Sequence, residues 1–204
     1  MNITNEILEP DTFYHIYNRG INSCKIFESE QNYLFFLEKF SKYMNGVIEV
    51  YAYCLMPNHF HFLIKVKPEN EIKTFVKVQN FDKGLKDKGL HSFDSIISKQ
   101  MGKFISSYSQ AYNKVTNRHG ALMESPFKRK RINSEEYLKN LIIYIHLNPL
   151  GLKINFEDYK FSSYKTLLSD AQTNLKRQET ITFFEDIENL IYCHNNPAKL
   201  NFEF

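Results

Sequence analysis

Short runs of β-branched and aromatic residues along the chain predict four strands. Three of them cover residues 13–17 (FYHIY), 47–55 (VIEVYAYCL) and 59–66 (HFHFLIKV). The breaker Met56-Pro57-Asn58 separates the second run from the third, so we expect these two strands to pair as a hairpin. A fourth run, residues 127–132 (FKRKRI), is predicted to be a short strand with exposed basic side chains.

Helical periodicity predicts three helices between and after these strands. The first is expected to begin at the cap Ser29 and to end at Gly46. The second is expected to bury one stripe of side chains, namely Ile97, Met101, Phe104, Ile105, Tyr108, Tyr112 and Val115. The third opens at Asn133, which has Glu136 at capping-box spacing, and must close at Asn148-Pro149 because the residue before proline avoids the helical region.

Two segments lack this clear periodicity. Residues 67–95 are expected to form an insertion or loop with at most one short helix, and residues 169–204 a polar tail with one helix around 182–192. The order that remains over residues 1–168 is β-α-β-β-α-β-α. This order predicts an α+β domain of the ferredoxin-like (split βαβ) plan, in which one antiparallel sheet has helices on one face.

Composition narrows the class of protein. Of the 204 residues, 43% are hydrophobic and 24% are charged, and no apolar run approaches the roughly 20 residues that span a bilayer. The first residues are polar, unlike an export signal, and the three cysteines lack CxxC spacing, so neither a disulfide framework nor a thiolate zinc site is indicated. We therefore expect a globular cytoplasmic protein with no membrane partner.

Charge is distributed unevenly along a chain whose net charge is only +3. Between positions 99 and 131, Glu124 is the single acid among eight bases, which are Lys99, Lys103, Lys114, Arg118, Lys128, Arg129, Lys130 and Arg131. Such a stretch can attract a polyanion although the whole chain is nearly balanced.

The pair His59 and His61 is the first candidate for chemistry. Alternate side chains of a strand share a face, so both imidazoles point the same way while Phe60 points to the other side. Two neighbouring histidines can hold one metal ion. For this short motif alone, a solvent-facing strand without a metal is an equally good interpretation.

The third helix supplies the second candidate. Tyr144 and Asn148 are four residues apart, on one flank of that helix and beside its apolar stripe. His146 points to nearly the opposite side, which excludes it as a third histidine ligand. Tyr108 and Tyr112 fall inside the stripe of the second helix, so packing explains them better than a nucleophilic role.

Four segments, taken in order, resemble a known family. They are residues 14–20 (YHIYNRG), 52–64 (AYCLMPNHFHFLI), 144–151 (YIHLNPLG) and 161–164 (FSSY). Together they resemble the single-tyrosine HUH transposases, in particular the REP-associated tyrosine transposase branch. The resemblance implies a ferredoxin-like nuclease domain that binds DNA with hairpin structure and cuts one strand.

The same resemblance assigns roles to residues by motif. It implies that His59 and His61 hold a divalent metal ion, Mg²⁺ or Mn²⁺, that Tyr144 is the nucleophile, and that Asn148 is a third ligand. The expected partner is single-stranded DNA with hairpin elements, bound by a monomer or homodimer. DNA contacts are expected from Arg19, Lys114, Arg118, Lys128, Arg129, Lys130 and Arg131.

A tyrosine hydroxyl has a pKa of about 10 and is a weak nucleophile at neutral pH, so a metal that polarises the phosphate would favour its attack. The product would be a 5′-phosphotyrosine link and a free 3′-OH, which makes strand transfer possible without an external energy source. Two alternatives remain open. One is a noncatalytic nucleic-acid-binding module of the same fold, and the other is a metal-dependent phosphodiesterase that uses water.

Overall fold

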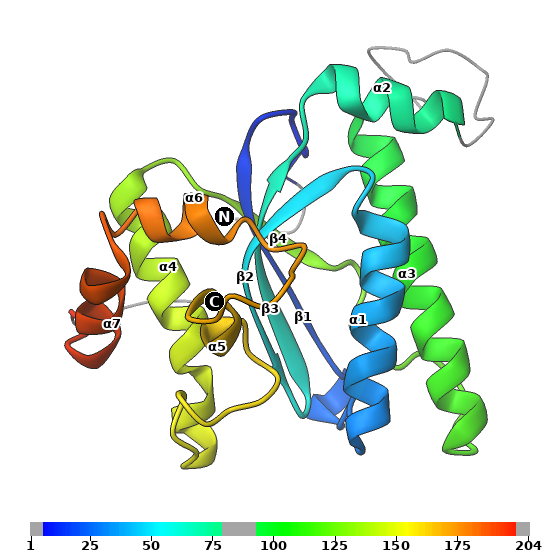
Figure 1. Ribbon diagram of the computed structural model, residues 1–204. Helices are drawn as coiled ribbons and strands as arrows, with labels where there is room; N and C mark the ends of the chain where they lie inside the picture. Colours follow the sequence, from blue (N-terminus) through cyan, green and yellow to red (C-terminus); the bar gives the residue numbers. More distant parts are fainter. Residues whose placement is uncertain (1–5, 79–92, 199–204) are drawn as a thin grey trace.

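A computed structural model describes residues 6–78 and 93–198, which are built around one antiparallel sheet (Figure 1). Its strands, in the order β2-β3-β1-β4, are β1 (Phe13–Arg19), β2 (Ile48–Met56), β3 (His59–Val66) and β4 (Lys128–Arg131). All three neighbouring pairs are antiparallel. This order is that of the ferredoxin-like plan, so the predicted fold class is confirmed, together with the β2–β3 hairpin.

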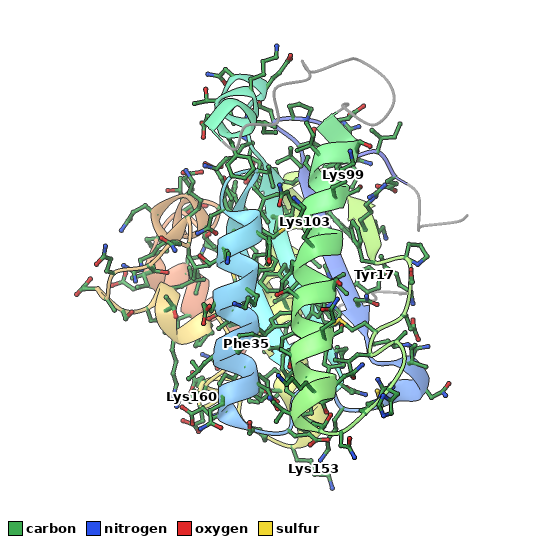
Figure 2. The ribbon with its side chains drawn as sticks, turned by 90° about the vertical axis from the view of Figure 1, so that its right-hand side faces the viewer. Tyr17, Phe35, Lys99, Lys103, Lys153 and Lys160 are labelled. Carbon is green, nitrogen blue, oxygen red and sulfur yellow. The ribbon has the colours of Figure 1, made fainter. Side chains whose placement is uncertain are left out.

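Two long helices cover one face of the sheet. These helices are α1 (Glu30–Met44) and α3 (Phe93–Val115), which lie side by side in Figures 1 and 2. The capping box of α1 is formed by Ser29 and Asn32. Phe36 packs between Phe104 and Phe62 of β3 in this core, which buries the even-numbered residues of the strand.

The expectation of helices on one face is wrong, because a second layer of helices covers the other face. It starts with α4 (Glu135–Leu147) and the 3₁₀ turn η3 (Asn148–Leu152), and continues with α5 (Tyr164–Leu167), α6 (Arg177–Thr182) and α7 (Ile187–Asn195). Ala52 and Leu63 of the sheet are fully buried against this layer. Strands β2 and β3 carry apolar side chains on both faces, so each face of the sheet must be covered by other elements.

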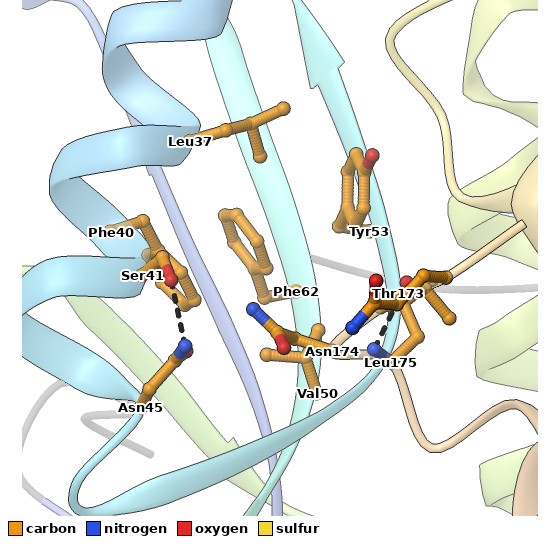
Figure 3. Close-up of a pocket in the computed structure, with 11 residues that line it drawn as sticks. Leu37, Phe40, Ser41, Asn45, Val50, Tyr53, Phe62, Thr173, Asn174 and Leu175 are labelled. Carbon is orange, nitrogen blue, oxygen red and sulfur yellow. Dashed lines mark hydrogen bonds between the residues drawn. The ribbon is translucent and has the colours of Figure 1, made fainter.

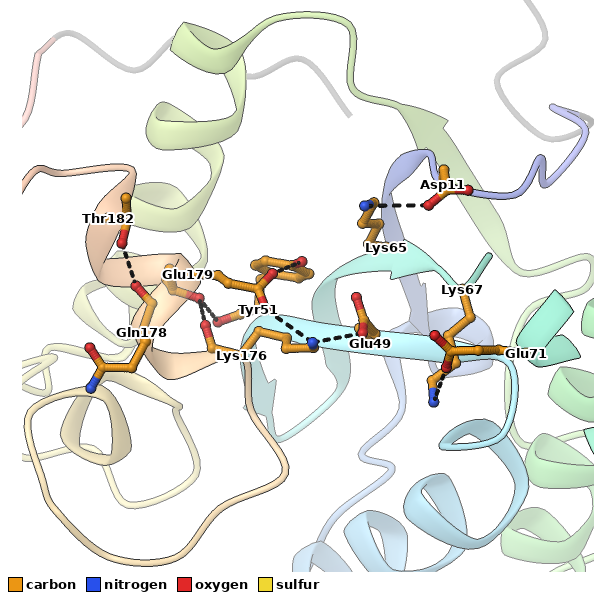
Figure 4. Close-up of polar contacts among 11 residues, drawn as sticks. Asp11, Glu49, Tyr51, Lys65, Lys67, Glu71, Lys176, Gln178, Glu179 and Thr182 are labelled. Carbon is orange, nitrogen blue, oxygen red and sulfur yellow. Dashed lines mark hydrogen bonds and ion pairs between the residues drawn. The ribbon is translucent and has the colours of Figure 1, made fainter. Parts of the chain in front are cut away.

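The segment predicted to be a tail is part of this second layer. Leu175 bridges to Val50 on β2, and Lys176 pairs with Glu49 at 2.7 Å. The hydroxyl of Tyr51 donates to Glu179 at 2.6 Å, so polar contacts fix α6 to the sheet (Figure 4). The polar composition of this segment did not indicate that it packs on the sheet, because α6 and α7 are short and bury few side chains.

Smaller differences concern element boundaries. The expected short helix after residue 67 is α2 (Glu69–Val78), and residues 79–92 of the predicted insertion lie outside the described residues. The cap of α4 is Ser134, whose side chain accepts the Tyr137 N–H, rather than Asn133. A short 3₁₀ turn, η2 (Ile21–Ser23), follows β1. In residues 6–78 and 93–198, no helix has the length and apolarity needed to cross a membrane.

Candidate active site

The two histidines of β3 line a cleft between the sheet and α4. His59 and His61 point to the same face, and their ring centroids lie 5.1 Å apart with the rings nearly perpendicular. Tyr144 of α4 packs with its ring edge-to-face on His61 at 5.5 Å. The cleft holds about 240 Å³ and is also lined by Tyr17, Asn18, Arg19, Ser23, Asn58 and Lys128.

Asparagines orient His59 from both sides. The Oδ1 atom of Asn58 lies 2.7 Å from Nδ1 of His59, which places the imidazole proton on Nδ1. The amide of Asn148 donates to the carbonyl of Tyr144 at 2.9 Å, so its Oδ1 atom faces Nε2 of His59, 3.4 Å away. Two lone pairs therefore point toward each other, an arrangement that a cation would bridge.

His61 has a support that the sequence analysis missed. Its Nδ1 atom lies 2.9 Å from Nε2 of His15, a fully buried residue of β1. Nδ1 of His61 is thereby engaged, and metal ligation by His61 would fall to Nε2. A ligating histidine usually carries such a partner on its second nitrogen. The alternation of His15 and Tyr17 along β1 is the only signal in the sequence for this contact.

Burial lowers the pKa of each histidine in the cleft. The pKa of His15 is lowered to about 3, and that of His61 lies well below its ordinary value because desolvation and the neighbouring histidines oppose a charge. Burial also lowers the pKa of His59. All three rings are neutral at neutral pH, which is the protonation state that metal ligation requires.

The hydroxyl of Tyr144 is protonated at neutral pH, since burial raises its pKa while the nearby Asn148 partly offsets the shift. The side chain is half-buried at the edge of the apolar core between the sheet and the layer of helices that contains α4. Packing thus holds the ring, while its position on the cleft wall leaves a path for a phosphate group. The expected position of Tyr144 and Asn148 on one flank of α4 agrees with this geometry.

The residues present fit a divalent metal ion. Imidazole nitrogens and an amide oxygen are ligands for Mn²⁺, and less readily for Mg²⁺, and His59, His61 and Asn148 are the three that converge here. Among the described residues, no three side chains of the types His, Cys, Asp and Glu form a metal cage. A metal here would thus keep positions for substrate oxygens or water.

Arg19 and Lys128 form the basic rim of the cleft. Both are paired with Glu124, at 2.5 Å for Arg19 and 3.5 Å for Lys128, which lowers the pKa of that carboxyl group. The chain turns sharply after Arg19, where a Cβ at Gly20 would lie 2.1 Å from the carbonyl oxygen of Cys24. Glycine is therefore required to bring β1 to an end beside the cleft.

The four consecutive bases of β4 do not share one surface. Lys128 and Lys130 face the α4 side of the sheet, where Lys130 lies 5.0 Å from the ring centroid of Tyr137. Arg129 faces α3 and donates to Ser98 at 3.1 Å, and the side chain of Arg131 pairs with Glu9. Only half of this basic run is therefore placed on the side of the cleft.

The bases of α3 and its following turn lie away from the cleft. Lys114 is exposed in the last turn of α3, and Arg118 donates to the carbonyl of Ala121 at 2.9 Å. Lys99 and Lys103 project from the upper half of the same helix (Figure 2). Since α3 covers the opposite face of the sheet from α4, none of these residues lines the cleft.

His146 lies on the opposite side of α4 from Tyr144, as expected from the helical period. It is fully buried and contacts His194 and Ser163. Tyr108 and Tyr112 are buried between α3 and the segment around Ile26, and their hydroxyls donate to the carbonyls of Ile26 and Lys25. None of these three side chains reaches the cleft.

A larger cavity of about 500 Å³ lies between α1 and the edge of β2 (Figure 3). Its floor consists of aromatic and aliphatic side chains such as Phe62 and Tyr53, and its rim carries amides and hydroxyls such as Asn45 and Asn174. Its lining contains no histidine, carboxylate or cation. The residues suited to phosphate chemistry are thus gathered in the smaller cleft.

Comparisons with known proteins agree with this geometry. Residues 10–88 match the family model described as IS200-like transposases, which confirms the resemblance recognised in the sequence motifs. A solved structure of a REP-associated tyrosine transposase bound to a REP hairpin superposes with a TM-score of 0.58 and 13% identity. The superposition covers 83% of this chain and 87% of that one, and it supports the fold. The comparison with curated proteins gave no match.

Proposed function

We propose that this chain, which the match of residues 10–88 relates to the IS200-like transposases, cuts and rejoins single-stranded DNA that carries a hairpin. Tyr144 would be the nucleophile. The observation that carries the proposal is the contact of Tyr144 with His61, in a cleft that also holds His59 and a basic rim. A tyrosine, two neutral imidazoles and cations in one cleft are the groups that phosphoryl transfer through a covalent intermediate needs.

The step breaks one bond and forms one. The oxygen of Tyr144 attacks the scissile phosphorus, the bond from phosphorus to the 3′ oxygen breaks, and the tyrosine proton is transferred as the 3′-OH forms. The products are a 5′-phosphotyrosine and a free 3′-OH. Attack on that link by a 3′-OH of another strand reverses the same chemistry and joins the two strands.

His59, His61 and Asn148 would hold a divalent metal ion, which when bound polarises the scissile phosphate and offsets its charge. Since burial raises the pKa of Tyr144, the chain does not supply a tyrosinate at neutral pH. Orientation is what the protein itself supplies: Asn58 and His15 fix the two imidazoles, and α4 presents the nucleophile.

Hairpin DNA is the proposed partner for two reasons. The structurally similar transposase was solved with a REP hairpin. In this chain, Arg19, Lys128 and Lys130 lie on the cleft side of the sheet, where they can bind backbone phosphates of the strand that enters.

The substitution Tyr144→Phe tests the proposal, because it keeps the ring and its packing but removes the attacking oxygen. The substrate is a hairpin oligonucleotide selected for binding to the parent protein from a pool with randomised loop and flanks, labelled on the 3′ side of the break. With Mn²⁺, the parent protein should form a labelled adduct that survives denaturation, and the variant should form none.

The alternatives predict different results in this experiment. If Tyr144→Phe cuts at the parent rate without an adduct, water is the nucleophile and the phosphodiesterase interpretation is correct. If the parent protein binds the hairpin but never cuts it, the chain is a binding module. A variant in the other core, Tyr108→Phe, is the matched control and should form the adduct as the parent does.

A further inference from the structure

A buried pair of histidines joins α4 to the C-terminal helix α7. Nδ1 of His146 lies 2.8 Å from Nε2 of His194, and the two residues are 0% and 1% exposed. On its other side, Nε2 of His146 lies 2.7 Å from Oγ of Ser163. Ser163 precedes α5 and is itself fully buried.

The partners of these groups determine the direction of every hydrogen bond. A carbonyl can only accept, so Nδ1 of His194 donates to the oxygen of Leu190 at 2.7 Å, and Nε2 of the neutral ring accepts from His146. Nε2 of His146 then carries no proton and accepts from the hydroxyl of Ser163 at 2.7 Å, a shorter contact than the 3.2 Å from that hydroxyl to the carbonyl oxygen of Tyr53. Ser163 in turn accepts the N–H of Tyr53 at 2.8 Å, so the chain of bonds ends on β2.

Both rings stay neutral because they are surrounded by apolar and aromatic side chains. The ring of Tyr164 lies 4.9 Å from that of His194 and 5.6 Å from that of His146. Burial lowers the pKa of His194 to about 4. Each buried nitrogen therefore has one defined role, and the network is fully satisfied.

This network holds the helix that carries the nucleophile. His146 lies between Tyr144 and Asn148 in sequence and, at about 100° per residue, on nearly the opposite side of α4 from Tyr144. A rotation of α4 that drew His146 out of its bonds would shift Tyr144 relative to His61. A displacement of about 1 Å at a reacting group can slow a reaction roughly 100-fold.

We propose that His194 is a positioning residue for Tyr144. By accepting the hydrogen bond from Nδ1 of His146, it fixes the rotation of α4 against the cleft. The expected effect on the reaction rests on the proposed function, whereas the hydrogen bond between His146 and His194 does not. Such positioning gives the C-terminal segment a role in the reaction through the contact of His194 with His146. The segment is held independently on β2 by the contacts of Lys176 and Glu179 shown in Figure 4.

Two substitutions at position 194 separate hydrogen bonding from packing. His194→Leu fills the same space with an apolar side chain of similar size but leaves Nδ1 of His146 without an acceptor. His194→Gln places an amide oxygen where Nε2 stood, so the bond to His146 can form. We expect His194→Leu to lower the single-turnover rate of adduct formation about tenfold or more, with unchanged affinity for the hairpin. His194→Gln should stay within about threefold of the parent rate.

Leu190→Ala is the control for a purely structural role. It removes a buried side chain from α7 but retains the carbonyl that accepts from His194. All variants are assayed well below their melting temperatures with the same hairpin and Mn²⁺. If Leu190→Ala slows the adduct as much as His194→Leu, or if His194→Gln is as slow as His194→Leu, the proposal is overturned.

Hydrogen exchange of the backbone amides of α4 tests, independently of activity, whether His194 holds this helix in place. His194→Leu should speed exchange in residues 141–147 about tenfold, whereas His194→Gln should not. If the parent protein forms no adduct, the proposed function fails while this measurement still tests the geometry. Unchanged exchange in His194→Leu would overturn the positioning role in either case.

Discussion

Nε2 of His15 lies 2.9 Å from Nδ1 of His61, so a buried histidine of β1 fixes the ring that faces Tyr144. The two residues are 46 positions apart in sequence and meet because β1 and β3 are antiparallel neighbours, with Tyr17 opposite His61. His15 is thus built into the sheet as the support of a proposed metal ligand.

The first prediction concerns this support. His15→Phe keeps a buried ring but removes the nitrogen partner of His61, so the affinity for Mn²⁺ should fall about 10- to 100-fold. The affinity is measured by the loss of the electron paramagnetic resonance signal of free Mn²⁺. Replacing the exposed His119 by Ala should leave the affinity unchanged, and equal affinities of His15→Phe and the parent would exclude the supporting role.

The metal ligands themselves give the second prediction. His59→Ala and His61→Ala should each abolish the covalent adduct, and chelation of the parent protein with EDTA should have the same effect. Hairpin binding should persist in all three cases, because the basic rim remains. The measurements are adduct formation on denaturing gels and binding by fluorescence anisotropy. Full cleavage by the double variant in the presence of chelator would show that neither histidine holds a required metal.

Local patterns along the chain predict the side-chain relations that depend only on backbone geometry. The period of a strand placed His59 and His61 on one face, and the period of a helix placed Tyr144 beside Asn148, because both relations depend only on backbone geometry. His15 was missed because its partner is set by strand register, which no local pattern of residues 13–17 reveals. The two-sided helical covering was missed for a similar reason, since apolar runs in β2 and β3 do not say which segments cover them.

The C-terminal segment illustrates another limit. Its charged and polar residues suggested a tail, yet Thr180, Phe184, Leu190 and His194 are each at most 2% exposed. Helices of six and nine residues show too few turns for a clear apolar stripe. Their docking depends on tertiary contacts such as those of His194 with His146, which lie 48 positions apart.

A third prediction follows from the division of the basic run on β4. Replacing Lys128 and Lys130 by Ala should weaken binding to single strands of any sequence and flatten its salt dependence by about 0.7 per lost contact, or roughly 1.4 in total. Replacing Arg129 and Arg131 by Ala removes the same charge from the α3 side of the sheet and serves as the matched control. Anisotropy titrations over a range of salt concentrations give both slopes. If the arginine pair flattens the slope as much, the DNA does not follow the α4 side.

The fourth prediction concerns stability at low pH. The pKa of His194 is about 4 in the folded protein and about 6.5 when unfolded, so between these values the unfolded chain binds more protons. Protonation of this residue therefore favours unfolding as the pH falls through that window. For one such group, the free energy of unfolding should drop by about 2 kcal/mol between pH 7.5 and pH 5. The groups that face it are His146, the carbonyl of Leu190 and the rings of Tyr164, Phe156 and Phe184, and none of them is an acid that could stabilise the charge.

Urea denaturation of His194→Gln measures this contribution. The variant cannot take up a proton at position 194, so its free energy of unfolding should decrease less than that of the parent over the same pH range. The remaining decrease belongs to the other buried histidines, whose folded pKa values are lowered in the same direction. His119→Gln, at an exposed position, should behave as the parent does. Parallel curves for the parent and His194→Gln would mean that folding leaves the pKa of His194 unchanged, so that its ring is charged in the folded protein at pH 5. The directed hydrogen bonds between His146 and His194 would then be wrong.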